Sequence, residues 1–187
     1  DCPGLNAVIR AVTKTAINDY NLEVWGIQDG FLGLIENRIE PLSFQTVSNI
    51  LTLGGTILGA SNKANPARYC TGVDDRGNPV CEDVTDLVLE NIRRAELDAI
   101  ICLGGDGTMS AASRLAERAI RVIGAPKTID NDLMHTEVTF GFHTAVETAS
   151  DACGRIRTTA ASHHRVMLVE LMGRNAGWLT LFAGAAS

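Results

Sequence analysis

The stretch Ala-Ile-Ile-Cys-Leu-Gly-Gly-Asp-Gly-Thr, residues 99–108, decides how this chain folds. Its first five residues form an apolar run, which is typical of a strand buried on both faces of a sheet. The glycine turn after the run leads into residues with apolar side chains at steps of three and four, which predict one face of a helix: Met109, Ala112, Ala116 and Ala119. Strand, glycine turn and helix in this order form the unit from which parallel α/β sheets are built.

The segments on both sides continue this alternation. Apolar spacing predicts helices over residues 5–17, 44–53, 83–97 and 140–161, and short apolar runs predict strands over residues 22–27, 121–125 and 166–171. Residues 61–79 are rich in Asn, Pro, Gly and Asp, and we expect an irregular surface excursion there. The predicted fold class is therefore α/β with a parallel sheet, in which ligands bind beyond the carboxyl ends of the strands.

The composition excludes several classes of protein. With 187 residues, 45% of them hydrophobic, the chain can bury a core of ordinary size. A net charge of −6, from 16 Lys and Arg against 22 Asp and Glu, has the wrong sign for a surface that binds nucleic acid. The longest apolar runs, of about five residues, fall far short of the roughly 20 that cross a bilayer. We expect neither a nucleic-acid partner nor a membrane segment.

The cysteines and the chain ends give two further expectations. Five cysteines, at positions 2, 70, 81, 102 and 153, are odd in number, scattered and without a CxxC pair. This pattern suggests neither a disulfide framework nor a zinc site, and a reducing cytoplasm is the expected compartment. Cys102, inside the apolar run, is expected to be a small core residue. The chain opens at Asp1 without a leader, and we expect it to be a piece of a longer protein.

The turn at residues 104–108 is suited to phosphate binding. Its glycines allow backbone N–H groups to approach a phosphate, and the N-terminus of the next helix adds positive partial charge. Asp106 would repel phosphates unless Mg²⁺ lay between them, so the turn predicts a polyphosphate together with a metal ion. The alternative is a tight turn in which Asp106 only caps the helix. GGDGT also resembles nicotinamide-nucleotide kinases and lipid kinases.

Residues 126–132, Pro-Lys-Thr-Ile-Asp-Asn-Asp, follow the next expected strand. In an extended backbone Asp130 and Asp132 project to the same side, so one carboxylate would accept a proton from an attacking hydroxyl while the other faces a metal. Thr128 would hydrogen-bond a substrate, and Lys127 would hold a transferring phosphoryl group. The alternative is a solvated Asp-Asn-Asp turn.

Further candidate cations lie outside these two segments. Arg174, directly after the last expected strand, would spread its guanidinium over several phosphoryl oxygens, or else form a surface ion pair. Lys63 and Arg165 are candidate phosphate contacts, and the alternative for each is an ordinary surface charge. His163 and His164 precede a strand and would face opposite ways, so we do not expect both to bind a metal.

Four segments, in their order and spacing, resemble 6-phosphofructokinase: DCPGLNAVIR at 1–10, LGGDGT at 103–108, PKTIDND at 126–132 and MGRNAG at 172–177. The resemblance covers nearly the whole chain. It implies a three-layer Rossmann-like lobe of that fold, a single donor-binding and catalytic lobe over residues 1–187 that lacks the family's first strand and most of its second, sugar-phosphate lobe. The implied reaction is Mg²⁺-dependent transfer of the γ-phosphoryl group of ATP to the 1-hydroxyl of fructose 6-phosphate, giving fructose 1,6-bisphosphate and ADP in glycolysis.

The same resemblance implies a role for each matching residue. Asp130 would be the base that takes the proton from the 1-hydroxyl, with Thr128 beside it, and Arg174 would stabilise the transferring phosphoryl group. Asp106 and Asp132 would hold Mg²⁺. The implied donor site comprises Lys63, Gly105, Asp106, Gly107, Thr108 and Lys127. The implied sugar-phosphate site comprises Thr128, Asp130, Asp132, Arg165, Met172, Gly173 and Arg174. Because the position matched by Arg165 reaches a neighbouring subunit's site in the family, a homo-oligomer, a dimer or a tetramer, is implied.

Two positions bear on the phosphoryl donor. Family members that use pyrophosphate commonly carry Asp where this chain has Gly107, since a bulky acidic side chain blocks the α-phosphate of a nucleotide. Lys127 points the other way, because pyrophosphate enzymes have lysine there. We expect ATP. The alternatives are a pyrophosphate-dependent fructose-6-phosphate 1-phosphotransferase and a truncated nucleotide-binding fragment without catalysis.

Overall fold

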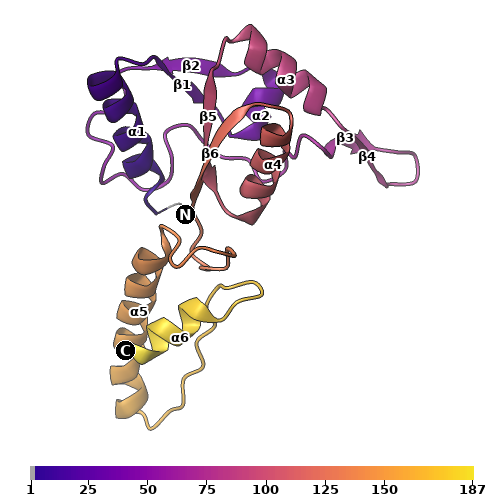
Figure 1. Ribbon diagram of the computed structural model, residues 1–187. Helices are drawn as coiled ribbons and strands as arrows, with labels where there is room; N and C mark the ends of the chain where they lie inside the picture. The colour runs from indigo at the N-terminus through magenta and orange to yellow at the C-terminus, as the bar shows by residue number, and fades with distance from the viewer. Residues whose placement is uncertain (1–2) are drawn as a thin grey trace. The chain divides into compact units, whose positions relative to one another are not determined.

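A computed structural model describes residues 3–187, so Asp1 and Cys2 of the segment DCPGLNAVIR lie outside the described residues. Helices and strands alternate along most of the chain, which confirms the predicted α/β class (Figure 1). Their bounds are α1 Leu5–Tyr20, β1 Val24–Ile27, α2 Phe31–Glu36, β2 Ile39–Leu42, β3 Tyr69–Val73, β4 Pro79–Glu82, α3 Thr85–Arg94, β5 Ala99–Gly104, α4 Asp106–Glu117, β6 Arg121–Pro126, α5 Phe142–Ser162 and α6 Trp178–Ala185.

The chain divides into two compact units. The first unit comprises the residues up to 102 together with residues 108–124, and the second unit comprises residues 103–107 together with residues 125–187. Strand β5 and strand β6 therefore each contribute to both units, and the phosphate-binding turn predicted at 104–108 is divided between them.

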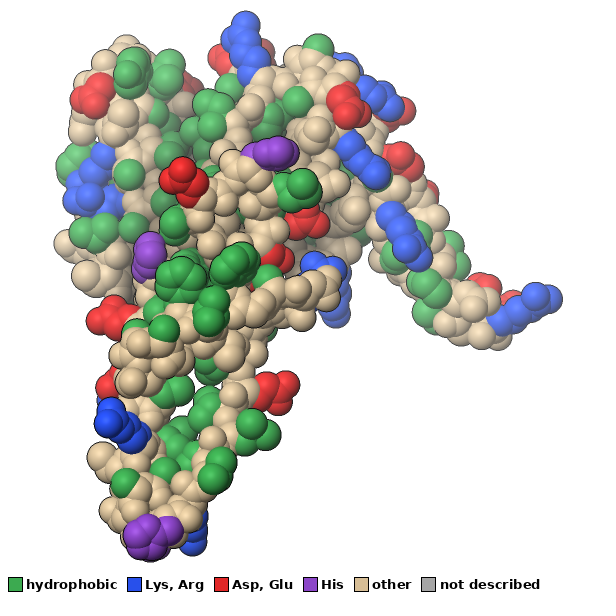
Figure 2. Space-filling view, turned by 60° about the horizontal axis from the view of Figure 1, so that its bottom comes forward, with side chains coloured by type: hydrophobic (Ala, Val, Ile, Leu, Met, Phe, Trp, Pro, Cys, Tyr) green, Lys and Arg blue, Asp and Glu red, His purple; other side chains and the backbone are tan. Residues whose placement is uncertain are grey.

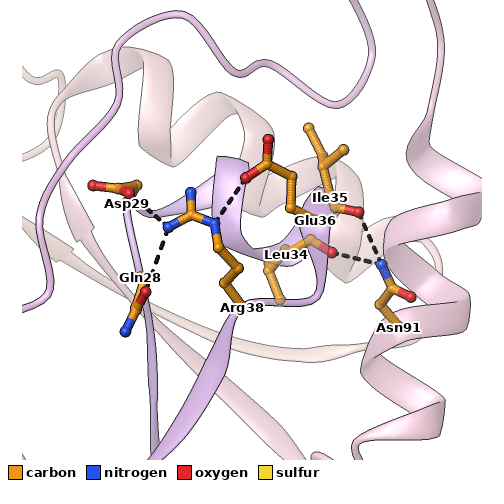
Figure 3. Close-up of polar contacts among 7 residues, drawn as sticks. All are labelled: Gln28, Asp29, Leu34, Ile35, Glu36, Arg38 and Asn91. Carbon is orange, nitrogen blue, oxygen red and sulfur yellow. Dashed lines mark hydrogen bonds and ion pairs between the residues drawn. The ribbon is translucent and has the colours of Figure 1, made fainter.

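The core of the first unit lies among α2, α3, α4 and β5. The predicted helical period over residues 83–97 is seen in α3, where Val88, Leu89 and Ile92 are at most 4% exposed. Cys102 belongs to the same core, as predicted, and burial raises the pKa of its thiol to about 11. Asn91 is also buried, and its side chain donates hydrogen bonds to the carbonyl oxygens of Leu34 and Ile35 at 2.8 and 3.1 Å (Figure 3).

Strands β5 and β6 lie side by side as a two-stranded sheet. Helix α4 connects them, and a crossover through a helix is the connection that parallel neighbours need. Strand β1 corresponds to the strand predicted over residues 22–27, but its partner β2 was not predicted. The two strands are antiparallel, with Val24 opposite Leu42, and β2 is only four residues long and contains Pro41, so its sequence carries little strand signal.

The helix predicted over residues 44–53 is wrong, because residues 44–49 form turns. The segment starts like a helix: the hydroxyl oxygens of Ser43 and Thr46 each accept a hydrogen bond from the other's backbone N–H, at 3.1 and 3.3 Å. Asn49 then adopts a φ of 62°, which ends any continuation.

Residues 61–79 are not irregular throughout, because β3 and β4 form an antiparallel hairpin at the end of this stretch. Asp74 fixes the hairpin turn by accepting backbone hydrogen bonds from Arg76 and Asn78 at 2.9 and 2.8 Å. The pairing sets Cys70 opposite Cys81, and the two form a disulfide. The expectation that the cysteines form no disulfide is therefore wrong for this pair, since hairpin register and not sequence spacing brings them together.

The strand predicted over residues 166–171 is also wrong. No strand within residues 3–187 pairs with this segment, and the side chains of Val166 and Leu168 are 100% and 99% exposed. An apolar run becomes a strand only where another strand satisfies its backbone groups.

The second unit has a small core of its own between α5 and α6. Phe142 and Ala149 on α5 are buried against Leu179 and Ala183 on α6. The rings of Phe142 and Phe182 meet edge to face, with centroids 5.5 Å apart. This core supports the loop that carries Asp130, because Ile129 packs against it.

Charged side chains of both signs lie on the surface (Figure 2). Acidic and basic side chains are interspersed over the face drawn in Figure 2. Among the described residues, none of the helices has both the length and the apolar character to cross a membrane.

Candidate functional site

The turn that follows β5 runs close to the segment that follows β6. The backbone N–H of Lys127 donates to the carbonyl oxygen of Gly104 at 2.8 Å. A Cβ atom added at Gly105 would lie 3.5 Å from the carbonyl oxygen of Lys127 and 3.8 Å from Cβ of Thr128. Asp106 begins α4 with its side chain exposed, next to this contact. The glycine turn and the start of the TIDND segment are thus neighbours within the second unit.

Hydrogen bonds fix the shape of the loop that carries Asp130. The backbone N–H of Asp130 donates to Oγ1 of Thr128 at 3.1 Å. Thr139, which is fully buried, donates from its hydroxyl to the carbonyl oxygen of Thr128 at 2.7 Å, and its backbone N–H donates to Oδ1 of Asn131 at 2.9 Å. Each such bond contributes about 0.5–1.5 kcal/mol net, so together they hold the loop in one conformation.

Thr139 and Asn131 are residues that the sequence reasoning missed. Asn131 was quoted only as a letter of the motif, although its φ of 51° and its bond to Thr139 shape the loop between the two aspartates. Thr139 lies outside every motif, and one threonine eight residues after Asn131 gives no signal in a sequence.

The carboxylate of Asp130 is partly buried in the loop. Its Oδ1 is enclosed and has no hydrogen-bond partner among residues 3–187. Burial raises the pKa of its carboxyl, and the nearby negative charge of Asp132 raises it further, while the positive charges of Arg174 and Lys127 lower it. Four charged side chains therefore act on one another here, and the enclosed oxygen is an acceptor without a donor.

Arg174 reaches this cluster from a tight turn. The backbone N–H of Ala176 donates to the carbonyl oxygen of Gly173 at 2.7 Å, and Arg174 adopts a φ of 49°. A Cβ atom at Gly173 would collide with the carbonyl oxygen of Ala176, so only glycine fits. Met172, just before the turn, is 71% exposed. The turn gives Arg174 a defined backbone and leaves its side chain exposed.

The remaining candidate residues are distributed over both units. Lys63 and Thr108 belong to the first unit. Arg165 is exposed after the end of α5, where its backbone N–H donates to the carbonyl oxygen of Ala160 at 2.9 Å. Gly107 is in the second unit, and a Cβ atom added there would meet nothing within 4 Å.

Few side chains of the site could bind a metal ion. Among the described residues, no group of three or more His, Cys, Asp or Glu side chains could hold a metal ion. Asp106 and Asp132 are the two candidate carboxylates, and both lie in the second unit. Mg²⁺ is commonly bound by one or two carboxylates together with substrate phosphates and water, so two carboxylates fit this ion and do not fit a site made of protein ligands alone.

A hollow of about 440 Å³ adjoins the aspartate loop in the second unit. Its lining combines residues of the loop with two aromatic side chains of α6: Asn131, Asp132, Leu133, Met134, Thr136, Glu137, Trp178 and Phe182. The sequence reasoning did not predict this hollow, because its walls come from segments some forty positions apart.

The cluster combines a partly desolvated carboxylate with two cations. Asp130 could take a proton from a hydroxyl, and Arg174 and Lys127 could hold an anion beside it. These are the parts that phosphoryl transfer to an alcohol requires.

Comparisons with known proteins identify the family. The family described as "PFK: Phosphofructokinase" matches residues 1–187. The "ATP-dependent 6-phosphofructokinase 2" of Clostridium perfringens is 53% identical over 186 residues, which cover 100% of this chain and 50% of that protein. A "Pyrophosphate--fructose 6-phosphate 1-phosphotransferase" of Dictyoglomus thermophilum is 45% identical over 186 residues, with the same coverage of both chains. The chain spans about half the length of these curated relatives.

A solved structure agrees. The Pichia pastoris phosphofructokinase in the T-state matches with a TM-score of 0.82 and 30% sequence identity, over 98% of this chain and 20% of that chain.

The charge cluster predicts how the pKa of Asp130 responds to mutation. Replacing Asp132→Asn removes a like charge and should lower the pKa of Asp130, and the part of the elevation caused by burial should remain. Carboxyl carbon NMR over a pH titration measures this pKa directly. The matched control is Asp151→Asn on the exposed side of α5, which should leave the titration of Asp130 unchanged. If Asp130 titrates identically in the Asp132→Asn variant, the two carboxylates do not interact.

Proposed function

The chain belongs to the phosphofructokinase family, and from that premise we propose that the protein is an ATP-dependent 6-phosphofructokinase, a glycolytic enzyme that phosphorylates the 1-hydroxyl of fructose 6-phosphate. The observation that carries the proposal is the enclosed Oδ1 of Asp130, in a carboxylate on which the charges of Asp132, Arg174 and Lys127 act. A solvated Asp-Asn-Asp turn would leave both oxygens of that carboxylate in water.

In the proposed reaction Asp130 takes the proton of the attacking 1-hydroxyl. A carboxylate is a weak base at its ordinary pKa, and burial makes it a better one by raising that pKa. Oδ1 is enclosed, so the other oxygen of this carboxylate would accept the hydrogen bond from the sugar hydroxyl. Thr128, bonded to the backbone of Asp130, holds the carboxylate in place. The proton thus moves from the sugar oxygen to Asp130 as that oxygen bonds to phosphorus and the bond to the donor breaks.

The positive charges of Arg174 and Lys127 would stabilise the negative charge of the transferring phosphoryl group. A guanidinium can bond several phosphoryl oxygens at once, whereas an ammonium acts as a point charge. Met172 and Gly173, in the segment before Arg174, would line the sugar-phosphate site. Mg²⁺, held by Asp106 and Asp132 together with the donor phosphates, would neutralise phosphate charge.

Gly107 supports ATP as the donor. The space around its Cα is open, so a nucleotide phosphate has room there. Lys63, Gly105 and Thr108 would complete the donor site with backbone and side-chain contacts. Lys127 supports pyrophosphate instead, and the relatives include enzymes named for either donor. We favour ATP because an acidic side chain at position 107 would exclude a nucleotide and is absent here.

The remaining proposals concern assembly and location. We propose that residues 1–187 belong to one donor-binding and catalytic lobe, and that Arg165, which is exposed, contacts the sugar-phosphate site of a neighbouring copy in a homo-oligomer. We also propose a cytoplasmic location, where the Cys70–Cys81 disulfide would be open to reduction to two thiols.

Removal of the proposed base is the first test. In the full-length protein Asp130→Ser should lower turnover about 10²–10⁴-fold, because the proposed base is removed and the other carboxylate of the loop, Asp132, is assigned to Mg²⁺. An aldolase-coupled assay with ATP and fructose 6-phosphate measures turnover. Asp151→Ser, an exposed aspartate of the same unit, is the control and should keep the activity. Turnover that survives in Asp130→Ser rejects Asp130 as the base, and a wild-type protein that binds ATP without turnover is a nucleotide-binding protein only.

Donor choice is tested at Gly107. The substitution Gly107→Asp meets open space, so the fold should tolerate it, but it should reduce kcat/KM for ATP at least about tenfold through repulsion and bulk near the nucleotide phosphates. Rates with ATP and with pyrophosphate are compared side by side, and Gly154→Asp on α5 controls for the added charge. Equal losses with both donors would remove the steric argument for ATP.

A further inference from the structure

Asn6 is a buried polar residue that no motif assigns to the reaction. It lies in the first turn of α1 and is 2% exposed. Its side-chain amide donates to the carbonyl oxygens of Leu53 and Gly54 at 3.0 and 3.3 Å, and its Oδ1 accepts from the backbone N–H of Ile57 at 2.8 Å. The side chain of Asn6 thus both donates hydrogen bonds to, and accepts one from, a loop about fifty residues further along the chain.

The loop that Asn6 holds, residues 53–59, has neither helix nor strand to define it. Gly55 and Gly59 adopt φ values of 69° and 74°, so this segment depends on conformations that cost entropy to fix. Within the loop the backbone N–H of Gly59 donates to the carbonyl oxygen of Thr56 at 3.2 Å. Asn6 makes three long-range hydrogen bonds with this loop: it donates to Leu53 and Gly54 and accepts from Ile57.

Asp29 holds the other end of the loop. Its backbone N–H donates to the carbonyl oxygen of Leu58 at 2.7 Å, and its carboxylate occupies the space that a Cβ atom at Gly59 would need. Arg38 in turn fixes that carboxylate by an ion pair of 2.7 Å, and also bonds Glu36 at 2.7 Å (Figure 3).

Lys63 is the fourth residue after Gly59, the last residue of the loop. Its backbone N–H donates to Oγ of Ser61 at 3.3 Å, and Ala64 next to it is buried in the core of the first unit. The short segment 60–63 therefore runs between two fixed points, the loop at Gly59 and the core at Ala64. The direction in which it presents Lys63 depends on where the loop is held.

Resting on the proposed function, in which Lys63 contacts the donor phosphates, we propose that Asn6 is a positioning residue for donor binding. It fixes loop 53–59 and thereby the segment that carries Lys63. Leu53, Gly54 and Ile57 are exposed, so water can replace the amide when Asn6 is removed. The first unit then stays folded, the loop gains conformations, and each of these must be given up again when the donor binds.

The test compares two buried asparagines in the full-length protein. Asn6→Ala should weaken the binding of Mg²⁺-ATP, measured by calorimetry without sugar phosphate, about five- to tenfold, and should speed amide hydrogen exchange at Ile57 and Gly59. Asn91→Ala is the matched control: it also removes a 2% exposed amide with two carbonyl partners, but these partners belong to α2. It should leave ATP affinity unchanged.

A double variant separates positioning from general damage. If Asn6 acts through Lys63, then Asn6→Ala should cause little further loss of ATP affinity in a Lys63→Met background. Full additivity of the two losses, or wild-type affinity in Asn6→Ala, overturns the proposal. A parent protein that binds ATP but does not phosphorylate fructose 6-phosphate overturns the proposed function alone, because the binding comparison still holds. A parent protein that does not bind ATP overturns both.

Discussion

The proposed chemistry depends on one electrostatic arrangement, a carboxylate kept partly out of water and acted on by one like charge and two positive charges. Burial and Asp132 favour the protonated form of Asp130, and Arg174 and Lys127 favour the ionised form. The opposition leaves a base with a raised pKa that is still held beside positive charge. The remainder of the second unit maintains this arrangement: Thr139 fixes the loop, Ile129 fastens it to the core of α5 and α6, and Gly173 allows the turn that presents Arg174.

Local sequence predicted the elements whose stabilising contacts lie nearby or repeat with a regular period. Helix α3 was predicted from apolar spacing and strand β5 from its apolar run. The expectation that β5 is buried on both faces is wrong, because Ile100 is buried whereas Ile101 is 42% exposed. The errors arise from strand pairing and from backbone conformation. The segment 166–171 has strand composition but no partner strand among the described residues, Cys70 and Cys81 meet only through hairpin register, and a φ of 62° at Asn49 ends the turns that follow Ser43.

Only part of the candidate site could be predicted from the sequence. The motifs name Asp130, Asp132 and Arg174 because these chemical types at strand ends are what phosphoryl transfer needs. They do not name Thr139 or Asn6, whose importance lies in bonds across eight and about fifty residues of chain. Such residues are ordinary polar letters in a sequence, and only the folded backbone gives them partners. Both act on a functional side chain through a loop.

The pH dependence of kcat/KM for fructose 6-phosphate is the sharpest test of Asp130 as the base. If Asp130 is the base, the rate should fall as the pH drops through its raised pKa, since the protonated carboxyl accepts no proton. Lys127→Met removes a nearby positive charge and should move this acid limb to higher pH, because the ionised carboxylate loses stabilisation. An acid limb at the same pH in both proteins would contradict the account.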